Sequence, residues 1–99
     1  MVKINWTLIS LSDLQNIFEY ISEDSVRYAQ MTVTKIHFRV SSLKSQPQLG
    51  RIVPEFEESN IRELISGNYR IVYEIIDNKK IDILRIYHSA RLLKKESLK

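Results

Sequence analysis

Residues 69–88 of the chain, YRIVYEIIDNKKIDILRIYH, carry the pattern of a β-hairpin. β-Branched and aromatic residues alternate with other side chains over residues 69–76 and return over residues 81–88, as in strands that are buried on one face. The polar residues 77–80 between these two runs are typical of a turn. The segment therefore predicts two antiparallel strands joined by a short loop.

The register of this hairpin stays open at the level of sequence. One register pairs Ile76 with Ile81 beside the turn. It also places two further pairs opposite one another on the expected core face: Ile71–Ile86 and Tyr73–Leu84. A slip of one residue sets Arg70 against His88 instead. In both registers Arg70 lies next to the end of the last strand.

Two amphipathic helices are predicted upstream of the hairpin. Apolar residues recur at steps of three and four in the second helix, namely at Val26, Ala29, Val33, Ile36, Val40 and Leu43. The first helix has a similar stripe: Leu11, Leu14, Ile17, Phe18 and Ile21. Ser10 and Ser25 are the expected N-caps. The break at residues 23–25 is so short that the two helices must fold back on each other.

Two shorter strands complete the expected elements. Val2, Ile4 and Trp6 alternate with polar residues, and residues 61–65 form a run closed by the turn-forming residues 66–68. The order predicts an α+β fold: an N-terminal β-strand, a two-helix antiparallel hairpin, and then a three- to four-stranded antiparallel sheet. The helices should cover one face of this sheet and leave the opposite face open.

Length and composition are typical of one globular domain. The chain has 99 residues, of which 43% are hydrophobic and 27% charged, with two glycines, two prolines and no cysteine. No run approaches the roughly 20 apolar residues that span a bilayer, and residues 1–12 lack the pattern of a signal peptide. We expect a single cytoplasmic domain over residues 1–99 with no membrane contact. Two histidines and no cysteine argue against a metal site, and no motif indicates a cofactor.

Basic residues gather at the C-terminal end. The net charge is +3, and five bases but only one acid follow residue 82: Arg85, Arg91, Lys94, Lys95 and Lys99 against Glu96. Residues 93–99 are expected to be a flexible basic tail. Two interpretations remain open, a solvated terminus or a basic rim that faces phosphate or an acidic protein.

Several short motifs occur in order along the chain. They are a strand with Trp6, SDL at 12–14, IFEYI at 17–21, GRIVPE at 50–55, IREL at 61–64, GNYRIVY at 67–73 and ILRIYHSARLL at 83–93. Together they resemble the RelE/ParE superfamily of toxins from bacterial type II toxin–antitoxin modules, also called the plasmid stabilisation family, with the ParE-like branch slightly favoured. The resemblance implies a toxin that inhibits growth and is neutralised by a cognate antitoxin with an acidic, helix-forming segment.

The molecular target differs between branches of this superfamily. ParE-like toxins inhibit DNA gyrase, whereas RelE-like and YoeB-like toxins cleave messenger RNA on the ribosome without a metal ion. The resemblance places Arg70 on the arginine that holds the scissile phosphate and Glu55 on the base. His88 falls on a histidine that acts as general acid or base, and Arg91 falls roughly on a second phosphate-binding arginine.

This sequence departs from the RNA-cleaving pattern at several positions. Ile61 and Glu63 stand where RelE-like toxins have lysines, and Ser89 or Ser97 stands where a C-terminal tyrosine is expected. A gyrase inhibitor needs none of these groups. Under that interpretation the target-binding candidates are basic residues: Arg62, Arg85, Lys94 and Lys95.

The candidate catalytic residues also have non-catalytic interpretations. Arg70 can form an ion pair with Glu63 or Glu74 on the sheet, and Glu55 can belong to a solvated acidic loop. His88 can be an ordinary strand-end residue. Whether the chain is an enzyme therefore stays open.

Overall fold

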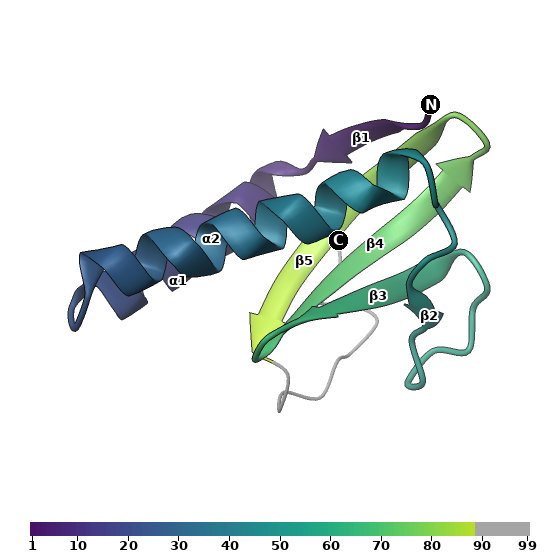
Figure 1. Ribbon diagram of the computed structural model, residues 1–99. Coiled ribbons are helices and arrows are strands. Elements are labelled where there is room, and N and C mark those ends of the chain that lie inside the picture. Colours follow the sequence, from purple (N-terminus) through teal and green to yellow (C-terminus); the bar gives the residue numbers. More distant parts are fainter. Residues whose placement is uncertain (89–99) are drawn as a thin grey trace.

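The computed structural model describes residues 1–88, which form a five-stranded sheet with two helices on one face (Figure 1). The strands lie in the order β1-β5-β4-β3-β2. In chain order the elements are β1 (Lys3–Trp6), α1 (Leu8–Ser22), α2 (Val26–Ser41), a short 3-10 turn η1 (Ser42–Lys44), β2 (Arg51–Ile52), β3 (Ile61–Ser66), β4 (Tyr69–Asp77) and β5 (Lys80–His88). The predicted α+β fold is confirmed, with four strands after the helices.

The first strand joins the sheet at the edge opposite β2. β1 runs parallel to β5, whereas all the other neighbouring strands are antiparallel. A parallel pair needs a long connection, and here the whole of α1, α2 and the strands that follow them lies between β1 and β5. Among the described residues, no helix is long and apolar enough to cross a membrane.

The hairpin between β4 and β5 combines two registers. Arg70 lies opposite Tyr87 and Ile71 opposite Ile86, as the first predicted register requires. Towards the turn the register shifts by one, so that Tyr73 faces Ile83 rather than Leu84, and a second shift follows between Ile75 and Asp77. The predicted pairings of Tyr73 with Leu84 and of Ile76 with Ile81 are therefore wrong. A bulge inserts an unpaired residue and can turn a side chain to the other face of the sheet, which periodicity alone does not reveal.

The helix caps are confirmed for α2 and corrected for α1. The Ser25 hydroxyl accepts a hydrogen bond from the Tyr28 N–H at 3.0 Å. In α1 the cap is Thr7, not Ser10: the Thr7 hydroxyl accepts from the Ser10 N–H at 3.1 Å and donates to the Ile83 carbonyl at 2.7 Å. Ser10 is fully buried and its hydroxyl donates to the Thr7 carbonyl at 2.8 Å. The Thr7 hydroxyl therefore both caps α1 and links the start of the helix to β5.

Both faces of the sheet carry an apolar cluster. The larger cluster lies under the helices and is centred on buried residues that include Leu14, Ile36, Leu64, Ile71 and Tyr73. A smaller cluster lies on the other face, where Val53 and Phe56 pack against residues from three strands: Ile61, Val72, Leu84 and Tyr87. The prediction of an open second face is therefore wrong, because the loop between β2 and β3 covers part of it.

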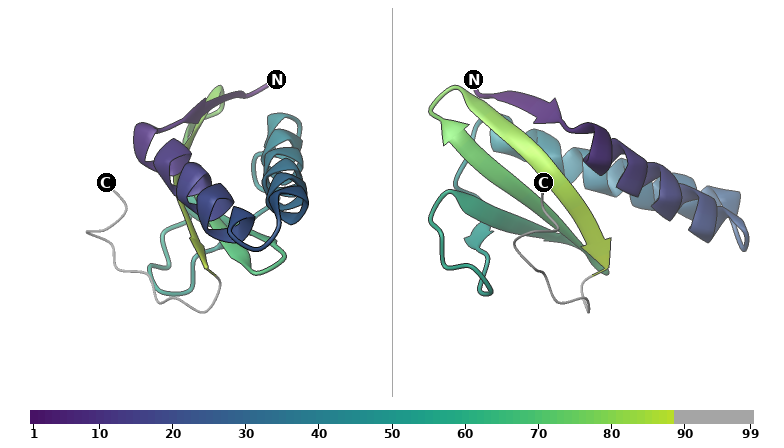
Figure 2. Two further views of the ribbon diagram at one scale, coloured as in Figure 1. Left: turned by 90° about the vertical axis from the view of Figure 1, so that its left-hand side faces the viewer. Right: turned by 180° about the vertical axis from the view of Figure 1, so that it is seen from behind.

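The helical hairpin projects beyond the end of the sheet (Figures 1 and 2). Val26 was expected in the core but is 55% exposed, because it lies at the projecting end where the sheet cannot cover it. Tyr20 and Tyr28 lie near the same end and are also exposed. Leu11 in the first turn of α1 is another expected core residue that is partly exposed. The apolar stripes thus extend further than the surface available to bury them.

Tyr73 ties the loop before β2 to the core. Its hydroxyl accepts from the Gly50 N–H at 2.9 Å and donates to the Pro47 carbonyl at 2.8 Å. The side chain is fully buried. Burial raises the pKa of Tyr73, so the folded protein holds the phenolic proton more tightly than the unfolded chain does.

Tyr73→Phe should lower the free energy of unfolding by about 1–3 kcal/mol at neutral pH, because it leaves two loop groups without their buried partner. Since the folded pKa is raised, the stability due to Tyr73 is complete below pH about 10 and is lost as the pH rises through the folded value. Urea unfolding at pH 7 and at pH about 10.5 should therefore show a smaller alkaline loss for Tyr73→Phe than for the wild type. Tyr20→Phe, at an exposed tyrosine, is the control. An equal alkaline loss in wild type and Tyr73→Phe would contradict this assignment.

Candidate functional site

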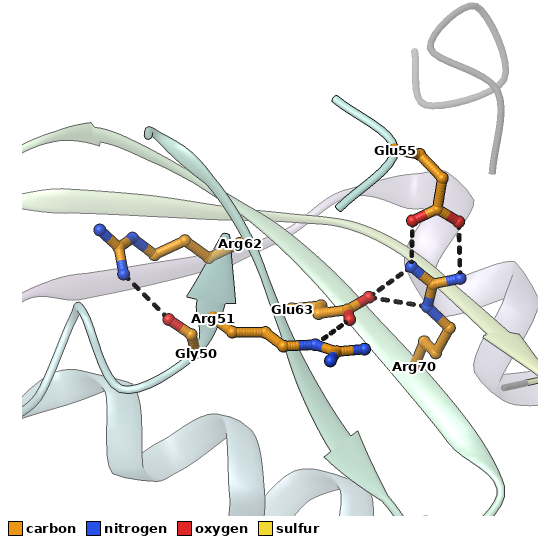
Figure 3. A network of polar contacts seen from close by, with 6 residues as sticks. All are labelled: Gly50, Arg51, Glu55, Arg62, Glu63 and Arg70. Atoms are coloured by element: carbon orange, nitrogen blue, oxygen red, sulfur yellow. Dashed lines mark hydrogen bonds and ion pairs between the residues drawn. The ribbon is translucent and has the colours of Figure 1, made fainter. Parts of the chain in front are cut away.

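Two arginines and two glutamates form a connected polar cluster at the β2–β3–β4 side of the sheet (Figure 3). Arg51 belongs to β2, Glu63 to β3 and Arg70 to β4, while Glu55 belongs to the loop between β2 and β3. The antiparallel pairing places Arg51 directly opposite Glu63. Glu63 and Arg70 come together because they lie on adjacent strands, two residues away from being direct partners.

The Arg70 guanidinium is held on two sides by carboxylates. Its Nη1 and Nη2 each donate to one oxygen of Glu55 at 2.9 Å, which is a bidentate pair. Its Nε donates to Glu63 Oε1 at 2.7 Å, and Nη2 lies 2.6 Å from the same oxygen. The second oxygen of Glu63 accepts from Arg51 Nε at 2.5 Å. Of the two ion-pair partners considered for Arg70, Glu63 is the one that the structure shows, and the pair is buried rather than on the sheet surface. Glu55 of the loop is a further partner of Arg70.

The cluster is more deeply buried at its centre than at its rim. The Glu63 side chain is fully buried and that of Arg70 is 7% exposed, whereas Glu55 is 21% and Arg51 63% exposed. The hydrogen bonds that Arg70 donates to Glu55, and then those that it donates to Glu63, raise the pKa of Arg70. Arg70 therefore stays charged, and its charge is balanced by the carboxylates that surround it.

His88 lies on the opposite face of the sheet from Arg70. Because successive side chains of a strand alternate between faces, His88 shares the helix-covered face with Tyr69, and its ring packs edge-on against the Tyr69 ring with centroids 5.9 Å apart. His88 also lines a hollow of about 510 Å³ beside α1, with Asn16, Ile17 and Tyr20 among its other walls. The structure brings Glu55 and Arg70 together and does not bring His88 to them.

Two of the four proposed target-binding residues are engaged within the fold. Arg62 Nη1 donates to the Gly50 carbonyl at 3.0 Å and its Nε donates to the Ser59 carbonyl at 3.1 Å. Arg85 forms a bidentate pair with Asp13 of α1, with Nε and Nη2 at 2.8 and 3.0 Å from its oxygens. The hydrogen bonds to Asp13 raise the pKa of Arg85.

The remaining candidates lie outside the described residues, namely Arg91, Lys94 and Lys95, as does the expected tail at 93–99. Within residues 1–88, no group of three or more histidine, aspartate or glutamate side chains is placed to hold a metal ion.

Sequence reasoning missed Arg51 and Asp13 as partners in these ion pairs. Glu63 gave a clearer sequence signal than Arg51 or Asp13. It is a charged residue between Ile61 and Ile65, which belong to the same face of the expected strand, and the fold buries it. A buried charge requires a partner. The sequence did not reveal that Glu63 would have two.

A family model described as the ParE toxin of the type II toxin–antitoxin system parDE matches residues 4–93, which is most of the chain. The chain belongs to the ParE toxin family. No curated protein sequence matches it significantly.

Solved structures with the same fold include toxins of several names. This ParE-family toxin superposes on a chain of the chromosomal ParDE system from P. aeruginosa with a TM-score of 0.72 and 25% identity, covering 89% of this chain and 96% of that one. A chain of the RelBE2 toxin–antitoxin complex from Mycobacterium tuberculosis superposes with a TM-score of 0.56 and 22% identity, covering 88% of this chain and 96% of that one. A YoeB/ParE toxin from Agrobacterium tumefaciens superposes with a TM-score of 0.59 and 19% identity, covering 88% of this chain and 98% of that one. The last two show the fold alone.

Proposed function

We propose that this ParE-family toxin inhibits bacterial growth by acting on DNA gyrase in the cytoplasm, and that a cognate antitoxin neutralises it. The observation that carries the proposal is that the Arg70 guanidinium already donates hydrogen bonds to two carboxylates, those of Glu55 and Glu63, on two of its sides. An arginine that holds a scissile phosphate must direct N–H donors at it. Here the donors Nε, Nη1 and Nη2 are already used within the fold.

The charge at this position also favours a protein target. Glu63 stands where RNA-cleaving relatives have a lysine, and it places a buried carboxylate 2.6 Å from Arg70. A carboxylate so close to the phosphate-binding position would repel RNA. His88 lies on the other face of the sheet, so a base, a phosphate-binding arginine and an acid would not converge on one bond.

The second candidate is ribosome-dependent mRNA cleavage by Glu55, Arg70, His88 and Arg91, without a metal ion. One observation favours it: Glu55 and Arg70 adjoin one another, as a general base and a phosphate-binding group must. For this activity Glu55 would have to release Arg70 when RNA binds.

The antitoxin would bind the exposed surface of the helical hairpin. α2 contains Arg27, Lys35 and Arg39 and no acidic residue. Large apolar side chains on the same helix are exposed: Tyr28, Met31 and Phe38. An acidic amphipathic segment complements both the charge and the apolar surface, and Lys94 and Lys95 would extend the basic surface.

Two assays on the full-length toxin separate the two targets. The first measures gyrase supercoiling of a plasmid, and the second maps the 5′ ends of a message after in vitro translation. We expect loss of supercoiling and an intact message. New 5′ ends that require translating ribosomes and disappear with His88→Ala would overturn the gyrase proposal in favour of cleavage.

Removal of residues 94–99 should raise the toxin concentration that half-inhibits gyrase by about tenfold, because a basic segment accelerates binding to a charged target. His88→Ala should change that concentration by less than about twofold, since the histidine has no catalytic role in this proposal. The supercoiling assay measures both. The reverse ranking of the two variants would count against the proposal.

A further inference from the structure

Lysines gather at the end of the molecule that holds the start of β1 and the turn between β4 and β5 (Figures 1 and 2). Residues 1–88 contain five lysines, and four of them lie at this end: Lys3, Lys44, Lys79 and Lys80. We call these four residues the lysine tip. All four are exposed. They come from three separate segments of the chain, so only the fold brings them together.

Backbone contacts fix the three segments of the lysine tip against one another. The Lys3 N–H donates to the Lys79 carbonyl at 2.8 Å, and the Val2 N–H donates to the Lys44 carbonyl at 3.1 Å. Lys3 of β1 and Lys80 of β5 are direct partners in the parallel pairing of these strands. Neighbouring strands lie about 5 Å apart, so the two lysines of this pair begin close together.

Carboxylates accompany the lysine tip but do not balance it. Asp77 lies in the same turn, and its Oδ1 accepts a backbone N–H of that turn at 2.7 Å. Lys80 Nζ lies 3.8 Å from Asp82 Oδ1, which is long for an ion pair. Asp82 and Glu74 face each other on β5 and β4, two residues further into the sheet. The tip itself therefore has an excess of positive charge.

The pair of Lys3 and Lys80 is unfavourable within the isolated domain. Like charges directly opposite one another on neighbouring strands destabilise a sheet. Both side chains are exposed, so no burial of apolar surface compensates for the repulsion. An anion bound between the two ammonium groups would relieve it. The fold thus holds two cations where a negatively charged ligand would stabilise them.

A phosphate backbone matches the lysine tip better than an acidic protein surface does. Lysine is depleted at protein–protein interfaces relative to the rest of a protein surface, whereas lysine and arginine supply the sequence-independent contacts to nucleic-acid phosphates. The lysine ammonium is a flexible point charge that requires no fixed geometry of its anion. Duplex DNA carries one negative charge per ~1.7 Å of its axis, so it can engage several lysines at once.

We propose that the lysine tip binds the phosphate backbone of duplex DNA without regard to base sequence. The inference goes beyond the proposed function, because this contact does not require gyrase. For a toxin that acts on gyrase, the contact would hold the toxin on the DNA that gyrase also binds.

The test measures binding of the full-length toxin to labelled duplex DNA of mixed sequence, by fluorescence anisotropy at about 50 and about 200 mM salt. The wild type should bind at the lower salt concentration and lose affinity steeply at the higher one. The double variant Lys3→Gln with Lys80→Gln should bind about tenfold more weakly at the lower concentration. It should also lower the slope of log affinity against log salt by about two, since each lysine that contacts a phosphate contributes about one.

The matched control is Arg27→Gln with Lys35→Gln, which removes the same charge from exposed positions of α2. It should weaken binding by less than about threefold, because charges far from the bound phosphates are screened by salt. Lys44→Gln with Lys79→Gln is a second pair of changes in the lysine tip and should behave as the first pair does. Circular dichroism establishes that each variant is folded.

The proposal would be wrong if the wild type did not bind DNA at the lower salt concentration. It would also be wrong if the tip variants and the α2 control lost equal affinity, because binding would then follow net charge rather than the tip. Displacement of the labelled DNA by polyglutamate as readily as by unlabelled DNA would indicate an acidic protein partner instead. Since the assay contains no gyrase, none of these results bears on the proposed inhibition of supercoiling.

Discussion

Arg70→Ala is expected to lower the free energy of unfolding by about 3–5 kcal/mol, because it leaves the carboxylate of Glu63 buried without its principal partner. Arg51 alone would then face Glu63, from a side chain that is 63% exposed. Glu55 would also lose its bidentate partner, which removes one of the contacts that hold the β2–β3 loop on the sheet. Urea unfolding monitored by circular dichroism measures the loss.

The controls for Arg70→Ala separate an unpaired charge from lost packing. The double variant Arg70→Met with Glu63→Leu removes both charges together and should recover most of the stability, since apolar residues replace a buried ion pair at little cost. Lys80→Ala breaks an exposed pair with Asp82 at 3.8 Å and should cost less than about 1 kcal/mol. A single variant Arg70→Ala as stable as Lys80→Ala would show that the cluster does not stabilise the fold.

Loss of toxicity in an Arg70 variant does not by itself show that Arg70 is catalytic. A catalytic arginine at a strand end would be replaceable with little change in melting temperature. The buried pair with Glu63 instead predicts that Arg70→Ala loses activity through unfolding. Only variants whose folding has been measured can therefore test a role for Arg70 in catalysis.

Gly50→Ala is expected to destabilise the protein by about 3 kcal/mol or more, at the upper end of the range for overpacked sites. A Cβ at this position would lie 2.5 Å from the Glu63 carbonyl oxygen and 2.7 Å from the Tyr73 ring. The first neighbour is backbone of a central strand and cannot move aside easily. The Gly50 N–H also bonds to the Tyr73 hydroxyl at 2.9 Å, so any displacement weakens that bond. Thermal and urea unfolding measure the effect.

Gly67→Ala is the matched comparison for Gly50→Ala. Gly67 has a φ of +58° in the turn between β3 and β4, and a Cβ there would meet no atom within 4 Å. Its cost is backbone strain alone, about 1–2 kcal/mol. If Gly67→Ala proved the more damaging of the two, the close approach of the Gly50 loop to Glu63 and Tyr73 would be called into question.

The elements were predictable because their signals are local. The spacing of Ala29, Val33, Ile36 and Val40 follows from the pitch of a helix, and the hairpin around residues 77–80 follows from strand alternation and turn residues. The Ser25 cap is also local, since its hydroxyl reaches only three residues along the chain. Short-range geometry of this kind repeats wherever the residues occur.

The candidate site was only partly predictable. Arg70, Glu55 and Glu63 were all recognised as residues of interest, but whether Arg70 faced a phosphate or a carboxylate depended on how three strands and a loop come together. His88 lies apart from Arg70 because Arg70 pairs with Tyr87, which places Arg70 and His88 on opposite faces of the sheet. Which face each side chain takes depends on the register of the β4–β5 hairpin, and the sequence left two registers open.

The sequence by itself determined the two helices, the strands β1, β3, β4 and β5, the α+β class, the family resemblance and the excess of basic residues at the C-terminal end, but not the two-residue strand β2. Only the tertiary structure decided that Thr7 caps α1, that bulges shift the β4–β5 register, that the second face is covered and that Glu63 lies between two arginines. Thr7 contacts Ile83 and Asp13 contacts Arg85 across more than seventy residues of chain. Such contacts arise from the packing of whole elements, whereas the pattern of side chains along one element reports only its own periodicity.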